Sequence, residues 1–433
     1  MDDDPFSNRQ LALARHKSWL AELIAKPLFR RTIAINMAYF SRQFSRWSSQ
    51  STSVVHNPNI YLEPWQRQIL LVCNGLTRIL VSRVLKLEYL KIRNQNRLVR
   101  AILSRFVIED KKPELKCVAT LRRHSSCVNS VAFHPTAPLL ATCCLDHTAK
   151  LWHILPNGSR ATCVASLEGY SNWVNSVAFH PTAPLLATGS DNTAKLWRFL
   201  PDGTSATCVA TMRGHNSLVL SVAFHPTSPL LATGSTDNTA KLWHISPDGF
   251  SPDGLEATCV ATLRGHSSDV NSVAFHPTAP LLATGSWDKT TKLWHISPNG
   301  SSATCVATLE GHSSYVNSVA FHPTAPLLAT GSWDMTTKLW RFSPDGTSAT
   351  CVATLEGHCN WVLSVAFHPT APLLATGSKD DTVKLWRFSP DGTSATCVAT
   401  LEGHSCWVCS VAFHPTAPLL ATGSADNTIK LWR

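Results

Sequence analysis

Histidine and aspartate recur together along this 433-residue chain, in a pattern that suggests acid/base chemistry. His215 and Asp237 form one such pair, and a carboxylate that orients an imidazole is an arrangement used by general bases. A second set of histidines occurs in the tripeptide Phe-His-Pro, at His134, His180, His225, His276, His322, His368 and His414. A ring of imidazoles would suggest a metal or phosphate site. Both interpretations depend on the elements that position these side chains.

We expect the Phe-His-Pro histidines to be turn residues that were copied together with a repeat. Equivalent residues in neighbouring repeats would lie too far apart to share one ion, because tetrahedral zinc needs ligands ~2 Å from the metal. The chain also lacks the phosphate-binding loop motif, the GxSxG motif, the HExxH motif and paired CxxC sites. The sequence therefore predicts no enzyme activity, metal, cofactor or small-molecule substrate.

The histidines belong to a long internal repeat. Its period is marked by the cysteine of a TCVAT or KCVAT motif, at Cys117, Cys163, Cys208, Cys259, Cys305, Cys351 and Cys397. Within each copy, segments such as VNSVAFHP, LLATGS and TKLWRF are bounded by Pro, Gly, Asp or Asn, which is typical of strands separated by turns. A fourth segment, ATCVATLEG, leads into the next copy. Four antiparallel strands per repeat, with a period of roughly 46 residues, predict one blade of a β-propeller.

At these residues the chain resembles the WD-repeat family, the β-propellers typified by the G-protein β subunit. The resemblance covers residues 117–433 and recurs in register. The family pattern of His, Ser or Thr, Asp and Trp falls here at His215, Thr233, Asp237 and Trp243, with equivalent residues in the other copies. The resemblance implies that these four side chains form a hydrogen-bonded chain inside each blade, which makes the His and Asp copies structural.

The sequence departs from the family pattern in three ways. The Asp of the Trp-Asp dipeptide is replaced by Arg or His in every copy. The first copy has Arg123 in place of Gly, and the second has Tyr170 in place of His. The second copy also has a turn one residue shorter before Asp191. We therefore expect the second blade to have the weakest internal network.

The two ends of the repeat array predict how the ring closes. The last copy stops at its third strand, IKLWR, while the first begins with a spare fourth-strand segment, KCVATL, at residues 116–121. Pairing these segments would remove two open sheet edges, which are templates for aggregation. The predicted fold is an all-β, seven-bladed propeller over residues 113–433, closed by pairing of the first and last repeats and preceded by a mainly α-helical, basic region at residues 1–112.

The N-terminal region carries the positive charge of the chain. Residues 1–116 hold 20 Lys or Arg and 9 Asp or Glu, whereas the repeats are close to neutral. Apolar residues at helical spacing include Ile33, Met37, Phe40, Phe44 and Trp47, and a Ser-rich linker is expected near residues 48–58. Three interpretations of residues 1–112 remain open: docking on the propeller or on itself, contact with an acidic membrane surface, and contact with a nucleic acid.

The start of the sequence, its most apolar stretch and its cysteines indicate the compartment of the protein and the redox state of its thiols. The start MDDDPF is acidic, so no secretory signal is seen, and the most apolar stretch, residues 69–90, is interrupted by charged residues. We expect a cytoplasmic protein, with the nucleus as the other compartment. Seven of the 14 cysteines occupy one fixed repeat position, which predicts packed, small apolar side chains with free thiols.

The candidate binding site follows from the positions at which the copies differ. These are the residue before the invariant Val of the first strand, the residue two places later, and the residue before the turn Asp. In a propeller these positions open on one end of the ring, and five of the 15 Trp occupy them. The predicted partner-binding residues are Trp173, Asp269, Trp287, Tyr315, Trp333, Trp361, Lys379 and Trp407.

Two functional hypotheses follow from this pattern. Trp is enriched at binding hot spots, whereas neutral drift of tolerated positions would favour small polar residues. The main hypothesis is a non-enzymatic scaffold or adaptor that binds a protein or peptide on the Trp-rich face. The alternative is a protein that the basic N-terminal helices target to a membrane surface or a nucleic acid, with the propeller as its structural body.

Overall fold

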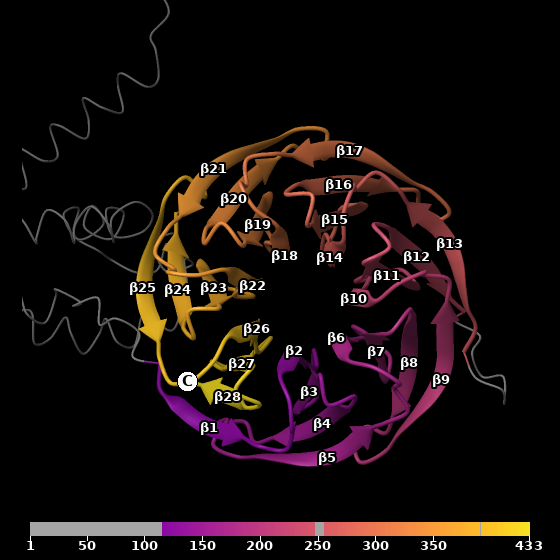
Figure 1. Cartoon of the computed structure of the whole chain (residues 1–433), viewed down its shortest axis with the longest axis vertical. Helices are drawn as coiled ribbons and strands as arrows, with labels where there is room; N and C mark the ends of the chain where they lie inside the picture. The colour runs from indigo at the N-terminus through magenta and orange to yellow at the C-terminus, as the bar shows by residue number, and fades with distance from the viewer. Residues whose placement is uncertain (1–114, 247–254, 390) are drawn as a thin grey trace, which may run out of the picture. The chain divides into compact units, whose positions relative to one another are not determined.

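The computed structural model describes residues 115–246, 255–389 and 391–433. Within them, 28 strands form seven four-stranded antiparallel sheets, and Figure 1 shows these sheets as blades around a common axis. The all-β, seven-bladed propeller predicted from the repeat is therefore confirmed. The helices expected within residues 1–112, and the linker near 48–58, lie outside the described residues.

Each blade runs from an inner strand beside the axis to an outer strand at the rim (Figure 1). The inner strands are β2 (Val128–Phe133), β6 (Val174–Phe179), β10 (Val219–Phe224), β14 (Val270–Phe275), β18 (Val316–Phe321), β22 (Val362–Phe367) and β26 (Val408–Phe413). The second strands are β3 (Leu139–Cys144), β7 (Leu185–Ser190), β11 (Leu230–Ser235), β15 (Leu281–Ser286), β19 (Leu327–Ser332), β23 (Leu373–Ser378) and β27 (Leu420–Ser424). The third strands are β4 (Ala149–Ile154), β8 (Thr193–Phe199), β12 (Ala240–Ile245), β16 (Thr291–Ile296), β20 (Thr337–Phe342), β24 (Val383–Phe388) and β28 (Ile429–Trp432). The outer strands, in the same order of blades, are β5 (Ala161–Leu167), β9 (Ala206–Arg213), β13 (Ala257–Leu263), β17 (Ala303–Leu309), β21 (Ala349–Leu355), β25 (Ala395–Leu401) and, in the seventh blade, β1 (Cys117–Leu121).

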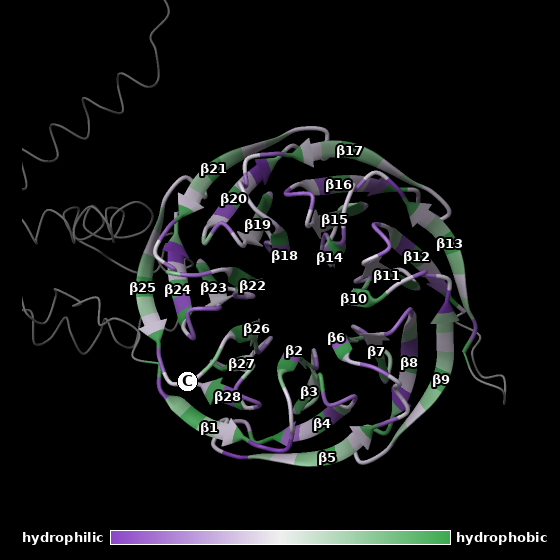
Figure 2. Cartoon of the chain, in the orientation of Figure 1, coloured by the Kyte–Doolittle hydropathy of each residue, from purple (hydrophilic) through white to green (hydrophobic). Residues whose placement is uncertain are grey.

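The hydrophobic core lies between neighbouring blades. One cluster joins Leu196 and Met212 of the second blade to Val219, Leu231 and Trp243 of the third. The second strands are the most deeply buried, because both of their faces are covered by adjacent blades, which explains the continuous LLAT sequence in place of an alternating one. Figure 2 shows that the third strands β16, β20 and β24, unlike the second strands, carry hydrophilic stretches.

The first and last strands of the propeller pair with each other and complete the seventh blade. Strand β1 pairs antiparallel with β28, with Thr120 opposite Lys430 and Leu121 opposite Ile429. The backbones of Lys116 and Arg433 extend this pairing through two hydrogen bonds, of 2.8 and 3.0 Å. The closure predicted from the spare segment at 116–121 is confirmed, and we call the junction of the first and seventh blades the seam.

A ring of hydrogen bonds also joins the inner strands of successive blades. The backbone N–H of Val222 donates to the Ser176 hydroxyl of the preceding blade at 3.1 Å. Equivalent bonds link the other neighbours, from Val131 to Ser410, Val177 to Ser130, Val273 to Ser221, Val319 to Ser272, Val365 to Ser318 and Val411 to Ser364. These contacts explain why the Ser and Val of the SVAFHPT motif are identical in all copies.

The repeated cysteines differ from the expectation. The cysteines of the TCVAT and KCVAT motifs are exposed, so the prediction that they are packed side chains is wrong. They lie on the outer strands, whose outward face has no neighbouring blade to cover it. Cys259, for example, lies opposite Trp243, and its Sγ is 3.7 Å from the carbonyl oxygen of Ala261 at a bulge in β13.

Candidate partner-binding face

The repeated His and Asp side chains are fully engaged within their blades. In the third blade, the indole N–H of Trp243 donates to the Thr233 hydroxyl at 2.9 Å. Nε2 of His215 lies 2.7 Å from the same hydroxyl, and Nδ1 lies 2.8 Å from Asp237. For a neutral imidazole we infer that Nε2 accepts from Thr233 and that Nδ1–H donates to Asp237. Neither ring nitrogen is left for a substrate.

The charges of this network are fixed by burial and hydrogen bonding. Burial lowers the pKa of His215, although the neighbouring carboxylate opposes the effect. Burial by itself would raise the pKa of Asp237, but hydrogen bonds from Thr239, Asn216 and His215 together lower it to about 2. At neutral pH the pair is therefore a neutral imidazole and a carboxylate, whose function is to tie the loop before the inner strand to the middle of the blade.

The second blade has a shorter network. The Tyr170 hydroxyl lies 2.7 Å from Thr188, which also accepts from the Trp197 indole at 3.0 Å. Asp191 accepts a hydrogen bond from Ser171, and its backbone has a φ of 43°. In this shortened turn Asp191 thus occupies the left-handed position that Asn238 holds in the third blade. The connection from the ring of residue 170 to the turn aspartate is lost, as the departures from the repeat pattern predict.

The Phe-His-Pro histidines stabilise turns at the other end of the inner strands. Nδ1 of His225 accepts two backbone hydrogen bonds, from Thr227 at 3.2 Å and from Ser228 at 2.9 Å. Its ring also packs edge-on against Phe275 of the next blade, with 4.9 Å between centroids. Burial lowers the pKa of His225, which favours the neutral form that can accept these bonds. Equivalent bonds occur in every copy.

One cluster in the first blade has the composition of a metal site. The ligand atoms of His124, Cys144 and Asp146 lie within 4.8 Å of one another. However, Nδ1 and Nε2 of His124 each lie 2.8 Å from a partner, Asp146 and Thr142 respectively. The Cys144 thiol donates to the Ser126 carbonyl at 3.1 Å, as Ser235 does to Ser217 in the third blade. The cluster is thus a copy of the blade network in which Cys replaces Ser.

The variable positions meet on the face opposite the Phe-His-Pro turns. Within every described blade except the second, whose turn is shortened, a backbone hydrogen bond places the residue before the turn Asp beside the residue before the inner strand. Trp333 N–H, for example, donates to the Tyr315 carbonyl at 2.9 Å, and Lys379 N–H donates to the Trp361 carbonyl at 2.9 Å. This local pairing forces the two variable side chains of one blade to project side by side.

Six of these side chains make a continuous surface that we call the aromatic strip. Its members, in order from the fourth to the seventh blade, are Trp287, Tyr315, Trp333, Trp361, Lys379 and Trp407. Trp287 stacks on Tyr315 with centroids 5.0 Å apart, and Trp333 stacks on Trp361 at 3.7 Å with an interplanar angle of 3°. The Lys379 ammonium lies 3.7 Å from the Trp361 ring centroid and 4.0 Å from that of Trp407. Contacts therefore alternate within blades and between neighbouring blades.

The ends of the aromatic strip differ in polarity. At the seventh blade, Trp407 is 41% exposed. At the fourth blade, the indole N–H of Trp287 and the side-chain amide nitrogen of Asn271 are buried and have no hydrogen-bond partner within the described residues. In the fifth blade the equivalent Trp333 indole donates to Asn317 at 3.3 Å. A buried donor without an acceptor is costly, so the fourth-blade end is suited to a ligand that supplies one.

The remaining predicted residues lie outside this continuous surface. Trp173 is 47% exposed on the second blade, and no ring contact joins it to the strip within the described residues. Asp269 meets the strip through its backbone carbonyl, which accepts from Trp287 N–H at 2.9 Å. Burial raises the pKa of the Asp269 carboxyl group. The sequence thus correctly places the variable residues on one face but does not distinguish Trp173 from the strip.

Sequence reasoning missed Met335, which is two residues beyond Trp333. Its side chain is 44% exposed at the apex of a turn, and its φ of 70° lies in the left-handed region that Asn and Gly favour. The same position is occupied by His147, Asn238, Lys289, Asp381 and Asn427 in other blades. This variation is a fourth signal of the same kind, and it would have identified an exposed apolar residue on the same face.

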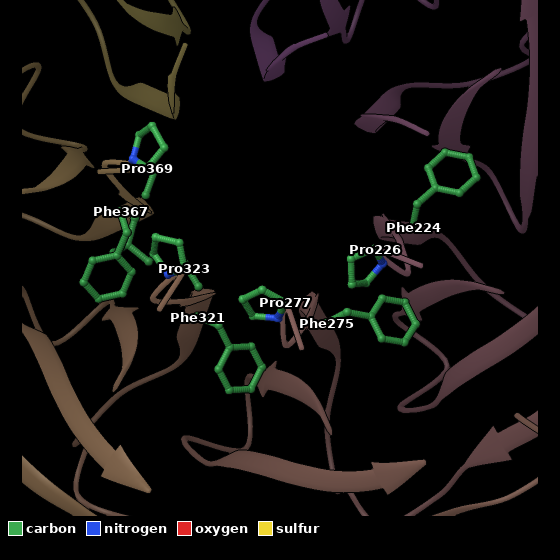
Figure 3. A pocket seen from close by; sticks show the side chains of 11 residues that line it. Phe224, Pro226, Phe275, Pro277, Phe321, Pro323, Phe367 and Pro369 are labelled. Atoms are coloured by element: carbon green, nitrogen blue, oxygen red, sulfur yellow. The ribbon is translucent and has the colours of Figure 1, made fainter. Parts of the chain in front are cut away.

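The opposite end of the ring holds an apolar pocket of about 460 Å³. It is lined by Phe, Pro, Ala and Val residues of the third to sixth blades, and Figure 3 shows the prolines closer to the axis than the phenylalanine rings. No charged or hydrogen-bonding side chain lines it, so nothing there would orient a polar substrate. The aromatic strip is the better candidate site.

Comparison with known proteins identifies the repeat. The family described as "WD domain, G-beta repeat" matches residues 115–153, 161–198, 206–244, 257–295, 303–341, 349–387 and 395–433. The "Ribosome biogenesis protein WDR12 homolog" of Nematostella vectensis is 49% identical over 39 residues, which is 9% of this chain and 9% of that relative. This match therefore has the length of a single repeat. Within the described residues, no helix is long and apolar enough to cross a membrane.

Proposed function

The chain belongs to the WD-repeat family, and from this premise we propose that it is a non-enzymatic scaffold that holds a peptide or protein segment on the aromatic strip. Propellers of this family typically bind other proteins, and the seven matches cover most of the chain. The repeated His and Asp side chains, which would be the residues for acid/base catalysis, are already hydrogen-bonded to each other and to Thr within the blades. The function that remains for this surface is recognition.

The observation that carries the proposal is the continuity of the strip across four blades. Six large side chains contact one another in sequence, whereas the same positions in the first and third blades hold smaller residues such as Cys127, Leu145 and Thr236. Aromatic rings that are already stacked lose little conformational entropy on binding, which is a property of interface hot spots. A gathered set of this kind also differs from scattered exposed apolar residues, which are ordinary on protein surfaces.

The strip also indicates the chemistry of its partner. Stacked indoles favour an extended segment with apolar or aromatic side chains. Lys379 is held between two Trp rings and presents a positive charge to an acidic group of the partner. The two unpaired donors at Asn271 and Trp287 would donate hydrogen bonds to a carbonyl or carboxylate oxygen of the partner. We therefore propose a partner segment in which apolar and acidic residues occur together.

Binding of a purified partner to full-length variants tests this function. A protein captured by the wild-type chain from a lysate of the source cell would be purified and titrated by fluorescence or calorimetry. Trp361→Ala removes the centre of the strip and should weaken binding by at least tenfold, since hot-spot truncations cost about 2 kcal/mol or more. Trp173→Ala is the matched control because it removes an exposed Trp outside the strip. Equal loss in both variants, or in neither, would reject the proposal.

A second candidate function rests on the charge of residues 1–116, which hold 20 basic and 9 acidic side chains. In this alternative the N-terminal region targets the protein to an acidic membrane surface or a nucleic acid, in the cytoplasm or the nucleus. Its signature would be full-chain binding to anionic vesicles or RNA that weakens steeply with salt and is unaffected by Trp361→Ala. The single-repeat match to the ribosome biogenesis relative does not decide between these partners.

A further inference from the structure

Two cysteines from opposite ends of the repeat array meet at the seam. Cys127 directly precedes β2 in the first blade, and Cys409 is the second residue of β26 in the seventh. Their sulfur atoms are 3.5 Å apart although 282 residues separate them in the sequence. Both residues occupy variable positions of the repeat, where other copies have Trp, Tyr, Asn, Asp or Leu. The seam is thus the junction of the described blades at which the variable positions supply two facing thiols.

The surroundings of the pair favour reaction with an oxidant. Both side chains are partly exposed, in contrast to the buried Cys143 and Cys144. The hydrogen bond with Cys409 lowers the pKa of the Cys127 thiol, while the same bond, followed by burial, raises the pKa of Cys409. Cys127 therefore has the greater thiolate character, and the thiolate is the reactive form of cysteine. Cys409 is held beside it as the second thiol.

We propose that Cys127 and Cys409 are an oxidation site, at which a hydroperoxide converts the two thiols into a disulfide that locks the seam of the ring. The sulfur atoms need to approach by about 1.5 Å to reach the disulfide bond length of about 2.05 Å. Both residues lie at the start of inner strands in a partly open region, where side-chain rotation provides this movement. The Cys409 sulfur also lies 3.6 Å from the carbonyl oxygen of Trp407, at the seventh-blade end of the aromatic strip.

The reaction proceeds in two steps. The Cys127 thiolate attacks one oxygen of the hydroperoxide, so that an S–O bond forms while the O–O bond breaks, and the leaving oxygen takes up a proton. For hydrogen peroxide this step yields a sulfenic acid and one water. Cys409 then attacks the sulfenic sulfur, forming the S–S bond and releasing the second oxygen as water with the thiol proton. In total, two thiols and one peroxide give one disulfide and two waters.

A disulfide at this position would have a specific effect on stability. The seam is otherwise held by hydrogen bonds and packing, including the bond from Val131 to Ser410, while the pairing of β1 with β28 joins the two ends of the array inside the seventh blade. A covalent link between residues 127 and 409 would close a loop that spans nearly the whole propeller. Long closed loops give the largest restriction of the unfolded chain, so we expect the oxidised protein to melt about 5 °C or more above the reduced protein.

Mass spectrometry of the full-length protein tests the proposal. The reduced chain is treated with one equivalent of hydrogen peroxide, its remaining thiols are alkylated, and digested peptides are searched for a 127–409 link. Cys409→Ser and Cys127→Ser should each abolish the link and the rise in melting temperature. Cys406→Ser is the matched control, because Cys406 lies close to Cys409 and is partly exposed, and it should retain both. Reduction with dithiothreitol should reverse both effects.

The outcomes separate the proposal from general thiol oxidation. The tryptic peptides that contain Cys127 and Cys409 also contain other cysteines, so fragment spectra of the wild-type peptides must assign the linked sulfurs. This assignment holds even if a serine variant fails to fold. A link through Cys406 or Cys143, a link that persists in Cys409→Ser, or oxidation to sulfinic acid without any link would overturn the proposal. So would an unchanged melting temperature in fully linked protein.

Discussion

The backbone N–H of Val131 donates to the Ser410 hydroxyl at 3.1 Å, and this bond crosses from the first blade to the seventh. The same bond joins Val273 to Ser221 between the fourth and third blades, at the same distance of 3.1 Å. The seam is therefore held near the axis by the same contact that holds every other pair of neighbouring blades. The ring of Ser–Val bonds makes the seam geometrically equivalent to the other junctions.

This equivalence predicts equal costs for two matched substitutions. Ser410→Ala and Ser221→Ala should each lower the free energy of unfolding by about 1–3 kcal/mol, because each leaves a buried backbone N–H unpaired. Both serines are buried to a similar extent, with 8% and 9% exposure. Denaturant titration would measure the two differences. A much larger cost for Ser410→Ala would show that the seam is the weakest junction and would contradict its equivalence to the others.

The blade networks predict different costs for the same change at two aspartates. Asp237→Asn should lower the free energy of unfolding by about 1–3 kcal/mol, because an amide has one acceptor oxygen and cannot serve His215, Asn216 and Thr239 together. Asp191→Asn should cost less than about 1 kcal/mol, since no histidine of the described residues hydrogen-bonds to Asp191 and Asn tolerates its positive φ. Similar losses at both sites in urea titrations would contradict the structural role assigned to the His–Asp bond.

The turn apex at residue 335 predicts a gain in stability. Met335→Asn should raise the free energy of unfolding by about 1 kcal/mol, because Asn adopts the left-handed conformation more readily than Met. Asn238 and Asn427 already occupy this position, with φ of 65° and 67°. Lys289→Asn is the control with the same backbone change and should give the same gain. A variant that is stabilised but binds the partner less tightly would assign Met335 to the partner surface.

Histidine burial predicts that the propeller loses stability on mild acidification. Burial lowers the pKa of ten histidines from their ordinary value of 6.5; these are His124, His134, His180, His215, His225, His276, His322, His368, His404 and His414. The unfolded chain therefore binds protons first as the pH falls below 6.5. The contribution of these neutral, buried histidines to the free energy of unfolding is therefore complete above pH 6.5 and decreases below it.

The network aspartates add a second, more acidic window. The pKa of Asp237 is about 2 in the folded protein and 3.8 ordinarily, so its contribution is present above about pH 4 and is lost as the pH falls toward 2. The melting temperature, measured between pH 7.5 and pH 3, should fall first below pH 6.5 and more steeply below pH 4. A melting temperature that is constant or rises between pH 7.5 and 5.5 would contradict the histidine assignment.

Repetition made most of the fold predictable from the sequence. The alternation of strand and turn segments gave the blades, and the missing fourth strand after IKLWR gave the closure by residues 116–121. Burial of the repeated cysteines was predicted wrongly, because strand composition does not reveal that the outward face of an outer strand has no neighbour to cover it. The position of Cys259 at a bulge on the rim follows only from the assembled sheet.

The candidate site was predictable in place but not in arrangement. Variation among the copies identified the face, because both variable loops lie at the same end of the strands. It did not reveal that Trp333 stacks on Trp361 of the next blade or that Lys379 lies between two indoles. These contacts depend on side-chain rotamers across blade junctions, which no spacing within one repeat encodes. For the same reason, the spacing does not reveal that Trp173 makes no ring contact with the strip within the described residues.

The two hydrogen bonds between Lys116 and Arg433 place both ends of the propeller at one point on the rim. Every blade except the seventh is built from one continuous segment, whereas the seventh takes its outer strand from the opposite end of the array. The ring therefore does not require that the seventh blade be the one assembled from both ends of the array. A circular permutant that joins residue 433 to residue 116 through a short linker, and starts instead at the turn before β17, should assemble the same seven sheets.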